Sequence, residues 1–217
     1  HCFQWGNLLE IGRLRDIWWQ ISQTLKTLAN DLNVPFRVLD LGGGLGLPYG
    51  EGEKTLDFQE VNQALNDVYR EFSPEKIWLE LGRYAVGEYG LYLTQVIDRK
   101  HVRGREILVT DGGINHIARP ALTQQSFPCE LFRESREGKR TFYVHGPLCT
   151  ALDKLGQFEL PADTEPGDWL MFHQSGAYGF TEAMPFFLCH NLPAETVLKN
   201  GRLEVTRTIR TAQNWLV

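Results

Sequence analysis

The clearest chemical signal in this 217-residue sequence is a glycine loop, Gly42-Gly43-Gly44. The loop follows residues 36–41, a short apolar run that is typical of a buried parallel strand. Glycines at the end of such a strand let backbone N–H groups approach an anion, because no Cβ atom stands in the way. A phosphate is the natural ligand of such a loop, although a tight turn without a ligand can carry the same glycines.

The same loop has a second interpretation, because residues 40–46 also fit D-x-G-x-G-x-G. That string is the nucleotide loop of Rossmann methyltransferases, which bind S-adenosylmethionine. Such a fold requires an acidic residue at the end of the next strand, about 20 residues further on. Asp57 and Glu60 lie at about that distance, but they open a polar helical segment and do not end an apolar strand. The loop alone does not decide between the two interpretations.

The elements that must position this loop alternate between strand and helix. Apolar residues at helical spacing predict helices over residues 11–32 and 57–72, the second with Asp57 as its N-cap. Short apolar runs predict strands at residues 36–41 and 77–80, so this part is a βαβ series with a parallel sheet. Beyond residue 86 short strands at 91–97, 106–110, 140–144 and 169–172 are separated by turn signals such as Asn200-Gly201. The predicted fold class is therefore α/β followed by all-β, with a boundary near residue 86.

Composition excludes several classes of protein. The chain is 42% hydrophobic and 23% charged, and its net charge of −5 argues against a nucleic-acid partner. No apolar run approaches the roughly 20 residues of a membrane span, so no membrane partner is expected. The four cysteines are widely spaced, form no C-x-x-C pair and suit a reducing cytoplasm better than a disulfide framework. We therefore expect a cytoplasmic protein without a metal site.

Three further motifs follow the glycine loop along the chain. They are Glu80-Leu81-Gly82-Arg83, Gly146-Pro147-Leu148-Cys149 and Gly176-Ala177-Tyr178-Gly179-Phe180. With the loop they resemble, in order, the G-G-G, E-P-G-R, G-P-x-C and G-A-Y motifs of the diaminopimelate, ornithine and arginine decarboxylases. Residues 111–115 and Arg119-Pro120-Ala121-Leu122 add to this resemblance, which runs through nearly the whole chain. Each motif is short, but four in the right order make a strong signal.

The resemblance implies a fold and a cofactor. The family has a (β/α)₈ barrel followed by a β-domain, with pyridoxal 5'-phosphate (PLP) at the C-terminal ends of the barrel strands. Residues 1–86 would hold the last strands and helices of the barrel, with residues 1–6 as one strand, and residues 87–217 the β-rich C-terminal domain. The family's Schiff-base lysine lies on the first barrel strand in a Y-x-x-K-A-N type motif. None of the lysines here has that context: Lys26, Lys54, Lys76, Lys100, Lys139, Lys154 and Lys199. We therefore expect a C-terminal portion whose N-terminal barrel half comes from the full-length chain.

The same resemblance gives the cofactor-binding residues their roles. PLP serves as an electron sink, and the protein supplies binding, orientation and electrostatics. Glu80 would pair with the ring nitrogen, because an opposite charge within a few Å favours the protonated ring. Arg83 would lie near the phosphate and the substrate. The remaining phosphate contacts would come from Gly42, Gly43, Gly44, Gly82 and the Tyr178 hydroxyl.

Catalysis and substrate binding would depend on the later motifs. Cys149 matches the family residue that protonates Cα after CO₂ has left, and its loop enters the neighbouring subunit's site, which implies a homodimer. Arg119, Thr150, Tyr178 and Arg83 match substrate-binding positions. Cys2, Cys129 and Cys189 lack a motif and are expected to be core residues.

Several positions depart from the family pattern. Thr150 stands where diaminopimelate decarboxylases usually have a glutamate, Thr123 stands where they have a tyrosine, and Leu81 replaces the proline of E-P-G-R. The family histidine that stacks on the PLP ring is replaced by Phe3, unless the alignment shifts by two residues and His1 takes that place.

We predict a PLP-dependent amino-acid decarboxylase, most similar to the diaminopimelate enzymes of lysine biosynthesis. Residues 187–195 resemble a side branch of the family that serves secondary metabolism and some carrier-linked substrates. A decarboxylase acting on another or carrier-linked amino acid, and a non-catalytic module derived from such an enzyme, therefore stay open as alternatives.

Overall fold

The computed structural model describes residues 1–50 and 52–215. The chain divides into two units, His1–Glu88 and Tyr89–Val217. The first is α/β and the second is rich in β-structure, so the predicted fold class is confirmed. Among the described residues, no helix has the length and apolar character that a membrane crossing requires.

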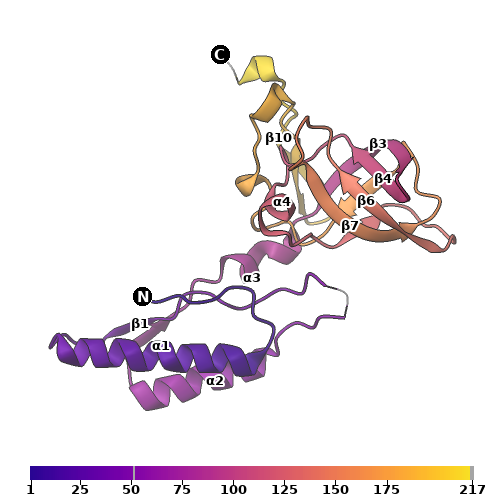
Figure 1. Ribbon diagram of the computed structural model, residues 1–217. Coiled ribbons are helices and arrows are strands. Elements are labelled where there is room, and N and C mark those ends of the chain that lie inside the picture. The colour runs from indigo at the N-terminus through magenta and orange to yellow at the C-terminus, as the bar shows by residue number, and fades with distance from the viewer. Residues whose placement is uncertain (51, 216–217) are drawn as a thin grey trace. The chain divides into compact units, whose positions relative to one another are not determined.

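Two helices form one layer of the first unit. α1 (Ile11–Asp31) buries Leu14, Trp18 and Ile21 at helical spacing, and α2 (Phe58–Phe72) lies against it (Figure 1). As predicted, Asp57 caps α2, because its carboxylate accepts hydrogen bonds from the N–H groups of Gln59 and Glu60.

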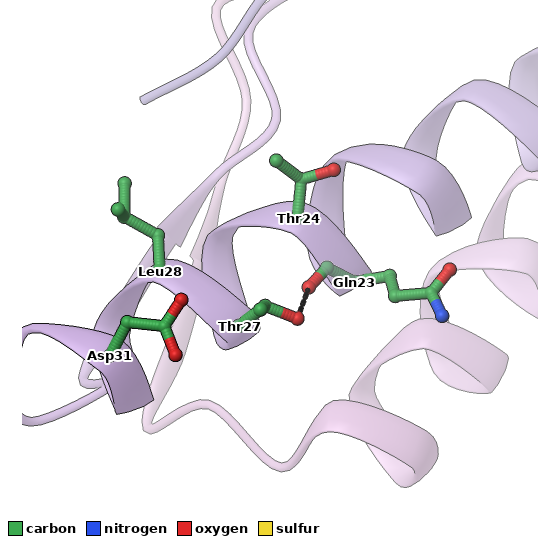
Figure 2. Close-up of a pocket in the computed structure, with 5 residues that line it drawn as sticks. All are labelled: Gln23, Thr24, Thr27, Leu28 and Asp31. Carbon is green, nitrogen blue, oxygen red and sulfur yellow. Dashed lines mark hydrogen bonds between the residues drawn. The ribbon is translucent and has the colours of Figure 1, made fainter.

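The outer face of α1 carries a shallow hollow of about 430 Å³ (Figure 2). Its lining consists of Gln23, Thr24, Thr27, Leu28 and Asp31, all from this one helix. Thr27 donates a hydrogen bond to the Gln23 carbonyl at 2.9 Å, which is an ordinary contact within a helix. None of the residues predicted to bind cofactor or substrate lines this hollow.

The other layer of the first unit is a short parallel sheet. β1 (Val38–Asp40) pairs with β2 (Lys76–Trp78), and Leu39 and Ile77 face the helices while Trp78 is exposed. The prediction of a regular strand at residues 1–6 is wrong. Among the described residues, the only backbone hydrogen bond between residues 1–6 and β1 runs from the Cys2 N–H to the Asp40 carbonyl, and one bond does not make a ladder. Asn7, with φ 55°, bends the chain directly after this segment. The chain that follows continues alongside the glycine loop, through a parallel bridge between Leu8 and Leu45.

The second unit is built on a six-stranded mixed sheet. The strand order is β5 (Cys129–Leu131), β8 (Trp169–Phe172), β3 (Tyr92–Val102), β4 (Arg105–Thr110), β6 (Lys139–His145) and β7 (Lys154–Pro161). β4 and β6 pair in parallel and the other neighbours are antiparallel. The sheet curls so that its two edge strands, β5 and β7, come into contact. The Phe158 ring of β7 also lies 5.6 Å from the Phe172 ring of β8, next to β5. Figure 1 shows β3, β4, β6 and β7 of this sheet.

Short elements complete both units. β9 (Glu195–Lys199) and β10 (Arg202–Arg207) form a hairpin around the predicted Asn200-Gly201 turn. The remaining pieces are α3 (Gly82–Val86), α4 (Arg119–Thr123) and the 3₁₀ turns η1 (Gly87–Tyr89), η2 (Phe180–Glu182), η3 (Phe187–Cys189) and η4 (Ala212–Asn214). Sequence patterns did not predict β5 or β7.

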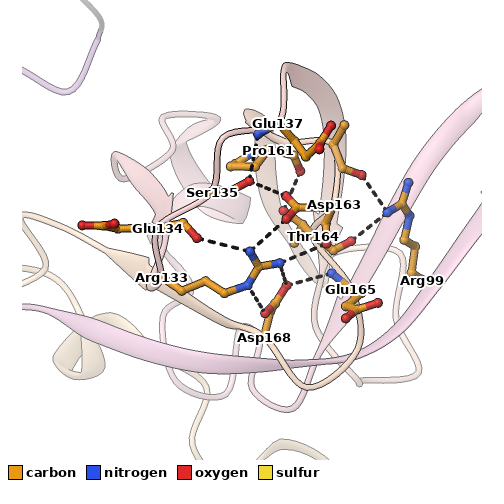
Figure 3. A network of polar contacts seen from close by, with 11 residues as sticks. Arg99, Arg133, Glu134, Ser135, Glu137, Pro161, Asp163, Thr164, Glu165 and Asp168 are labelled. Atoms are coloured by element: carbon orange, nitrogen blue, oxygen red, sulfur yellow. Dashed lines mark hydrogen bonds and ion pairs between the residues drawn. The ribbon is translucent and has the colours of Figure 1, made fainter.

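An arginine-centred network braces the loops at one end of the sheet (Figure 3). Arg133 donates to Asp168 from Nε and Nη2, at 2.6 and 2.9 Å, and to Asp163 from Nη1 at 3.0 Å. Arg99, on β3, donates to the carbonyls of Ala162 and Thr164 at 3.0 and 2.8 Å. Two guanidinium groups thus hold the 162–168 turn against its neighbours.

Candidate cofactor and substrate site

The glycine loop lies directly against the backbone of Glu80. The Glu80 N–H donates to the Gly42 carbonyl at 2.8 Å, and a Cβ atom placed on Gly43 would lie 2.7 Å from the Glu80 carbonyl oxygen. Gly42 and Gly44 have φ values of 67° and 114°, which disfavour any side chain. These glycines are therefore required by close packing, and the packing places the loop beside Glu80 at the C-terminal edge of the sheet.

Polar and aromatic groups converge at this edge. The Glu80 side chain is 61% exposed, and its Oε1 lies 3.6 Å from His1 Nδ1, which is 3.1 Å from Asp40 Oδ2. The Phe3 side chain lies against Gly42, so both residues considered for the ring-stacking role are here. In the described part of the chain, the N–H groups of Gly43 and Gly44 donate to no acceptor.

These groups fit PLP. Unpaired loop N–H groups suit a phosphate, and an exposed carboxylate beside them suits a protonated ring nitrogen. The side chains of His1, Asp40 and Glu80 also hold ligand atoms within 4.8 Å of one another, as a metal site would. Such exposed groups are common without an ion, and we assign no metal to them.

The other two cofactor-binding candidates of the first unit lie on α3. Arg83 is half-buried, and its guanidinium lies 5.7 Å from the centre of the Tyr49 ring. Gly82 opens the helix with no atom within 4 Å of a Cβ placed there. Close packing thus explains the glycines of the loop but does not explain Gly82.

A buried carboxylate that sequence analysis missed organises the second unit. The loops that follow the parallel strands β4 and β6 leave the sheet at the same end. Asp153, only 2% exposed, accepts hydrogen bonds from the N–H of Ile114 in one loop, at 2.8 Å, and from the N–H of Leu148 in the other, at 2.7 Å. A Cβ on Gly113 or Gly146 would collide with this carboxylate. No local pattern marks Asp153, because its partners lie in a distant loop as well as its own.

The exposed Cys149 lies midway along the second of these loops, residues 146–153. Thr150 donates its backbone N–H to the Leu148 carbonyl at 2.8 Å, so the thiol stands on a tight turn. Burial raises the pKa of Cys129, which suits the core role predicted for it. The same expectation is wrong for Cys189, which is exposed because it lies in the surface turn η3 with φ 57°.

Arg119 and Tyr178 meet in the same unit. The Arg119 guanidinium lies 4.7 Å from the centre of the Tyr178 ring, and its Nη1 is 3.0 Å from Glu182 Oε2. Glu182 was missed, although it follows the Gly176–Phe180 motif closely. A buried cluster of Ile114, Ala118 and Leu148 connects the start of α4 to the Cys149 loop.

A tyrosine–histidine pair fastens the loop after β4 to a distant segment. The Tyr92 hydroxyl lies 3.0 Å from His116 Nδ1, and His116 Nε2 lies 3.1 Å from the Asn191 carbonyl oxygen. Burial lowers the pKa of His116 and raises that of Tyr92. A neutral His116 therefore donates to Asn191 and accepts from Tyr92.

Comparison with known proteins now defines the class. Residues 18–176 match the family described as pyridoxal-dependent decarboxylase, C-terminal sheet domain. The chain belongs to this decarboxylase family, whose cofactor is PLP, and the methyltransferase interpretation is wrong.

Individual relatives agree with this assignment. The chain is 33% identical to the L-glutamyl-[BtrI acyl-carrier protein] decarboxylase of Niallia circulans over 190 residues, which cover 81% of this chain and 44% of that protein. It is 30% identical to the diaminopimelate decarboxylase of Escherichia coli over 229 residues, which cover 97% of this chain and 53% of that protein. The solved diaminopimelate decarboxylase of Helicobacter pylori, complexed with L-lysine, superposes with a TM-score of 0.82 at 25% identity, covering 97% of this chain and 51% of that one. The chain thus spans about half the length of the relatives that it matches.

Proposed function

We propose that this chain carries the ring and phosphate contacts and the proton donor of a PLP-dependent amino-acid decarboxylase. Residues 1–86 supply the last strands and helices of the cofactor-binding barrel, and residues 87–217 form the β-rich domain. The observation that carries the proposal is the exposed Glu80 carboxylate beside a glycine loop in which the N–H groups of Gly43 and Gly44 have no acceptor among the described residues.

The residues of the chain divide the work of binding. PLP, when bound, withdraws the electrons that the departing CO₂ leaves on Cα. Gly43 and Gly44, with Gly82 and the Tyr178 hydroxyl, would hold its phosphate through N–H and O–H donors. Gly42, whose N–H donates to Asp40 Oδ1 at 2.9 Å, would bind it by shaping the loop. Glu80 keeps the ring nitrogen protonated by its negative charge. Arg83 would lie close to the phosphate and orient the substrate.

In the reaction, the bond between Cα and the substrate carboxylate breaks and CO₂ leaves. The Cys149 thiol then gives its proton to Cα, and the thiolate regains one from water. Arg119, Thr150 and Tyr178 contact the substrate. We place the Cys149 loop in the site of a second copy, so the active form is a homodimer. Thiols without disulfide partners in the described residues suit the cytoplasm that we propose as its compartment.

The names of the relatives indicate which class of substrate to expect. Similarity to diaminopimelate decarboxylases supports a free amino acid of that kind, while the relative from Niallia circulans is named for an L-glutamyl group on an acyl-carrier protein. In either case the substrate is an α-amino acid that loses CO₂.

The test uses the natural gene product that contains this chain, incubated with PLP and each candidate amino acid. We expect release of CO₂, and a fall in kcat of roughly 10²–10⁴-fold for Cys149→Ser, the usual share of a positioned proton donor. Cys189→Ser is the matched control, since Cys189 is also exposed and lies outside the motif. PLP binding without CO₂ release from any substrate would support a non-catalytic module instead.

A further inference from the structure

The substrate contact Arg119 is already paired with an acidic side chain. Arg119 is 13% exposed, and its Nη1 lies 3.0 and 3.2 Å from the two carboxylate oxygens of Glu182. The Tyr178 ring, 4.7 Å from the guanidinium carbon, restrains it from another side. The guanidinium is therefore held in one place, and its charge is balanced before any substrate arrives.

The same arrangement occurs a second time on the neighbouring ring of the motif. Arg207 lies 4.1 Å from the centre of the Phe180 ring, and its Nη1 is 3.1 Å from Glu195 Oε2. Each ring of the Gly176–Phe180 motif is thus covered by an arginine that a glutamate neutralises. A carboxylate that approached Arg119 would gain attraction from the guanidinium and lose most of it to Glu182.

Apolar side chains follow Glu182 directly. Met184, Phe186 and Leu188 are 38%, 57% and 48% exposed, and the Tyr178 ring beside Arg119 is 39% exposed. Exposed apolar groups next to balanced charges suit an uncharged and extended group better than an ion.

We propose that this enzyme acts on an amino acid whose distal end is uncharged, namely a side-chain carboxyl joined to a larger group as an ester, amide or thioester. Glu182 is the residue that sets this preference, because it cancels the charge that a free distal carboxylate requires. The inference depends on the proposed function, and it adds the class of substrate.

A matched pair of substrates tests the inference on the natural gene product with PLP. L-Glutamate and its γ-methyl ester differ in the charge of the distal group, and kcat/KM is measured for each from CO₂ release. We expect the ester to be preferred by at least tenfold. Glu182→Gln should reduce the ratio of kcat/KM for the ester to kcat/KM for free glutamate by about tenfold, mainly by lowering KM for free glutamate. Glu182→Asp should leave this ratio unchanged.

Glu204→Gln, on the exposed strand β10, is the control and should leave the preference unchanged. The inference is overturned if the wild-type enzyme prefers free glutamate or meso-diaminopimelate over the ester, or if Glu182→Gln leaves the ratio of the two kcat/KM values unaltered. In both cases CO₂ is still released, so the proposed function stands. Absence of CO₂ from every substrate overturns the function and the inference together.

Discussion

Replacing Asp153 is expected to loosen two loops that are distant in sequence. Its carboxylate is 2% exposed and accepts from the N–H groups of Ile114 and Leu148, at 2.8 and 2.7 Å. Asp153→Asn keeps the volume but offers one acceptor oxygen, so one buried N–H loses its partner. Such a loss costs about 1–3 kcal/mol, and we take 2 kcal/mol as a central value. Asp153→Ala removes both acceptors and should cost about 4 kcal/mol.

Native-state hydrogen exchange measures this effect where it arises. A cost of about 2 kcal/mol corresponds to roughly 30-fold faster exchange of the Ile114 and Leu148 amides, because 1.4 kcal/mol is a factor of ten. Asp98→Asn is the control: this carboxylate is 52% exposed and pairs with the exposed Lys100 at 3.3 Å, so we expect a change below about 0.5 kcal/mol. If Asp153→Asn exchanges at the wild-type rate at both amides, the reasoning about this carboxylate is wrong.

Three further outcomes are expected. Gly43→Ala should weaken PLP binding more than tenfold in equilibrium dialysis, because its Cβ meets the Glu80 carbonyl, whereas Gly12→Ala, with open space around it, should not. Burial lowers the pKa of His116, so the neutral ring stabilises the fold fully above about pH 6.5. Urea midpoints should fall as the pH drops below that value, and less steeply in His116→Gln. Burial alone would raise the pKa of Asp168, but hydrogen bonds from Arg133 and Glu165 lower it. Its contribution is therefore present above about pH 3.9 and lost below it, and Asp168→Asn should reduce the acid dependence of thermal unfolding.

Sequence patterns predicted the elements that depend on local periodicity. Both long helices and the N-cap at Asp57 follow from the spacing of apolar residues and from capping chemistry. Two strands give too weak a pattern of alternating apolar residues to be recognised: β5 has three residues, and β7 has a glycine at its third position. Residues 1–6 do not form a regular strand, because in the described residues they make one backbone hydrogen bond to β1, and the spacing of apolar residues does not reveal how many such bonds a segment makes.

In the candidate site, too, sequence motifs located some residues, whereas contacts between residues distant in sequence were missed. Gly43 packs on the Glu80 carbonyl, Gly146 packs on the Asp153 carboxylate, and Gly176 is the contact of Gly90. Where another group packs too closely for a Cβ atom, the sequence must have glycine, so the spacing of the motifs could locate these positions. An ion pair between distant residues cannot be recognised in this way, since Arg119 and Glu182 are 63 positions apart and any acidic residue could be the partner of the arginine. Motifs therefore indicate the residues that we propose for cofactor binding, while the proposed determinant of substrate preference is a pair that only the folded chain brings together.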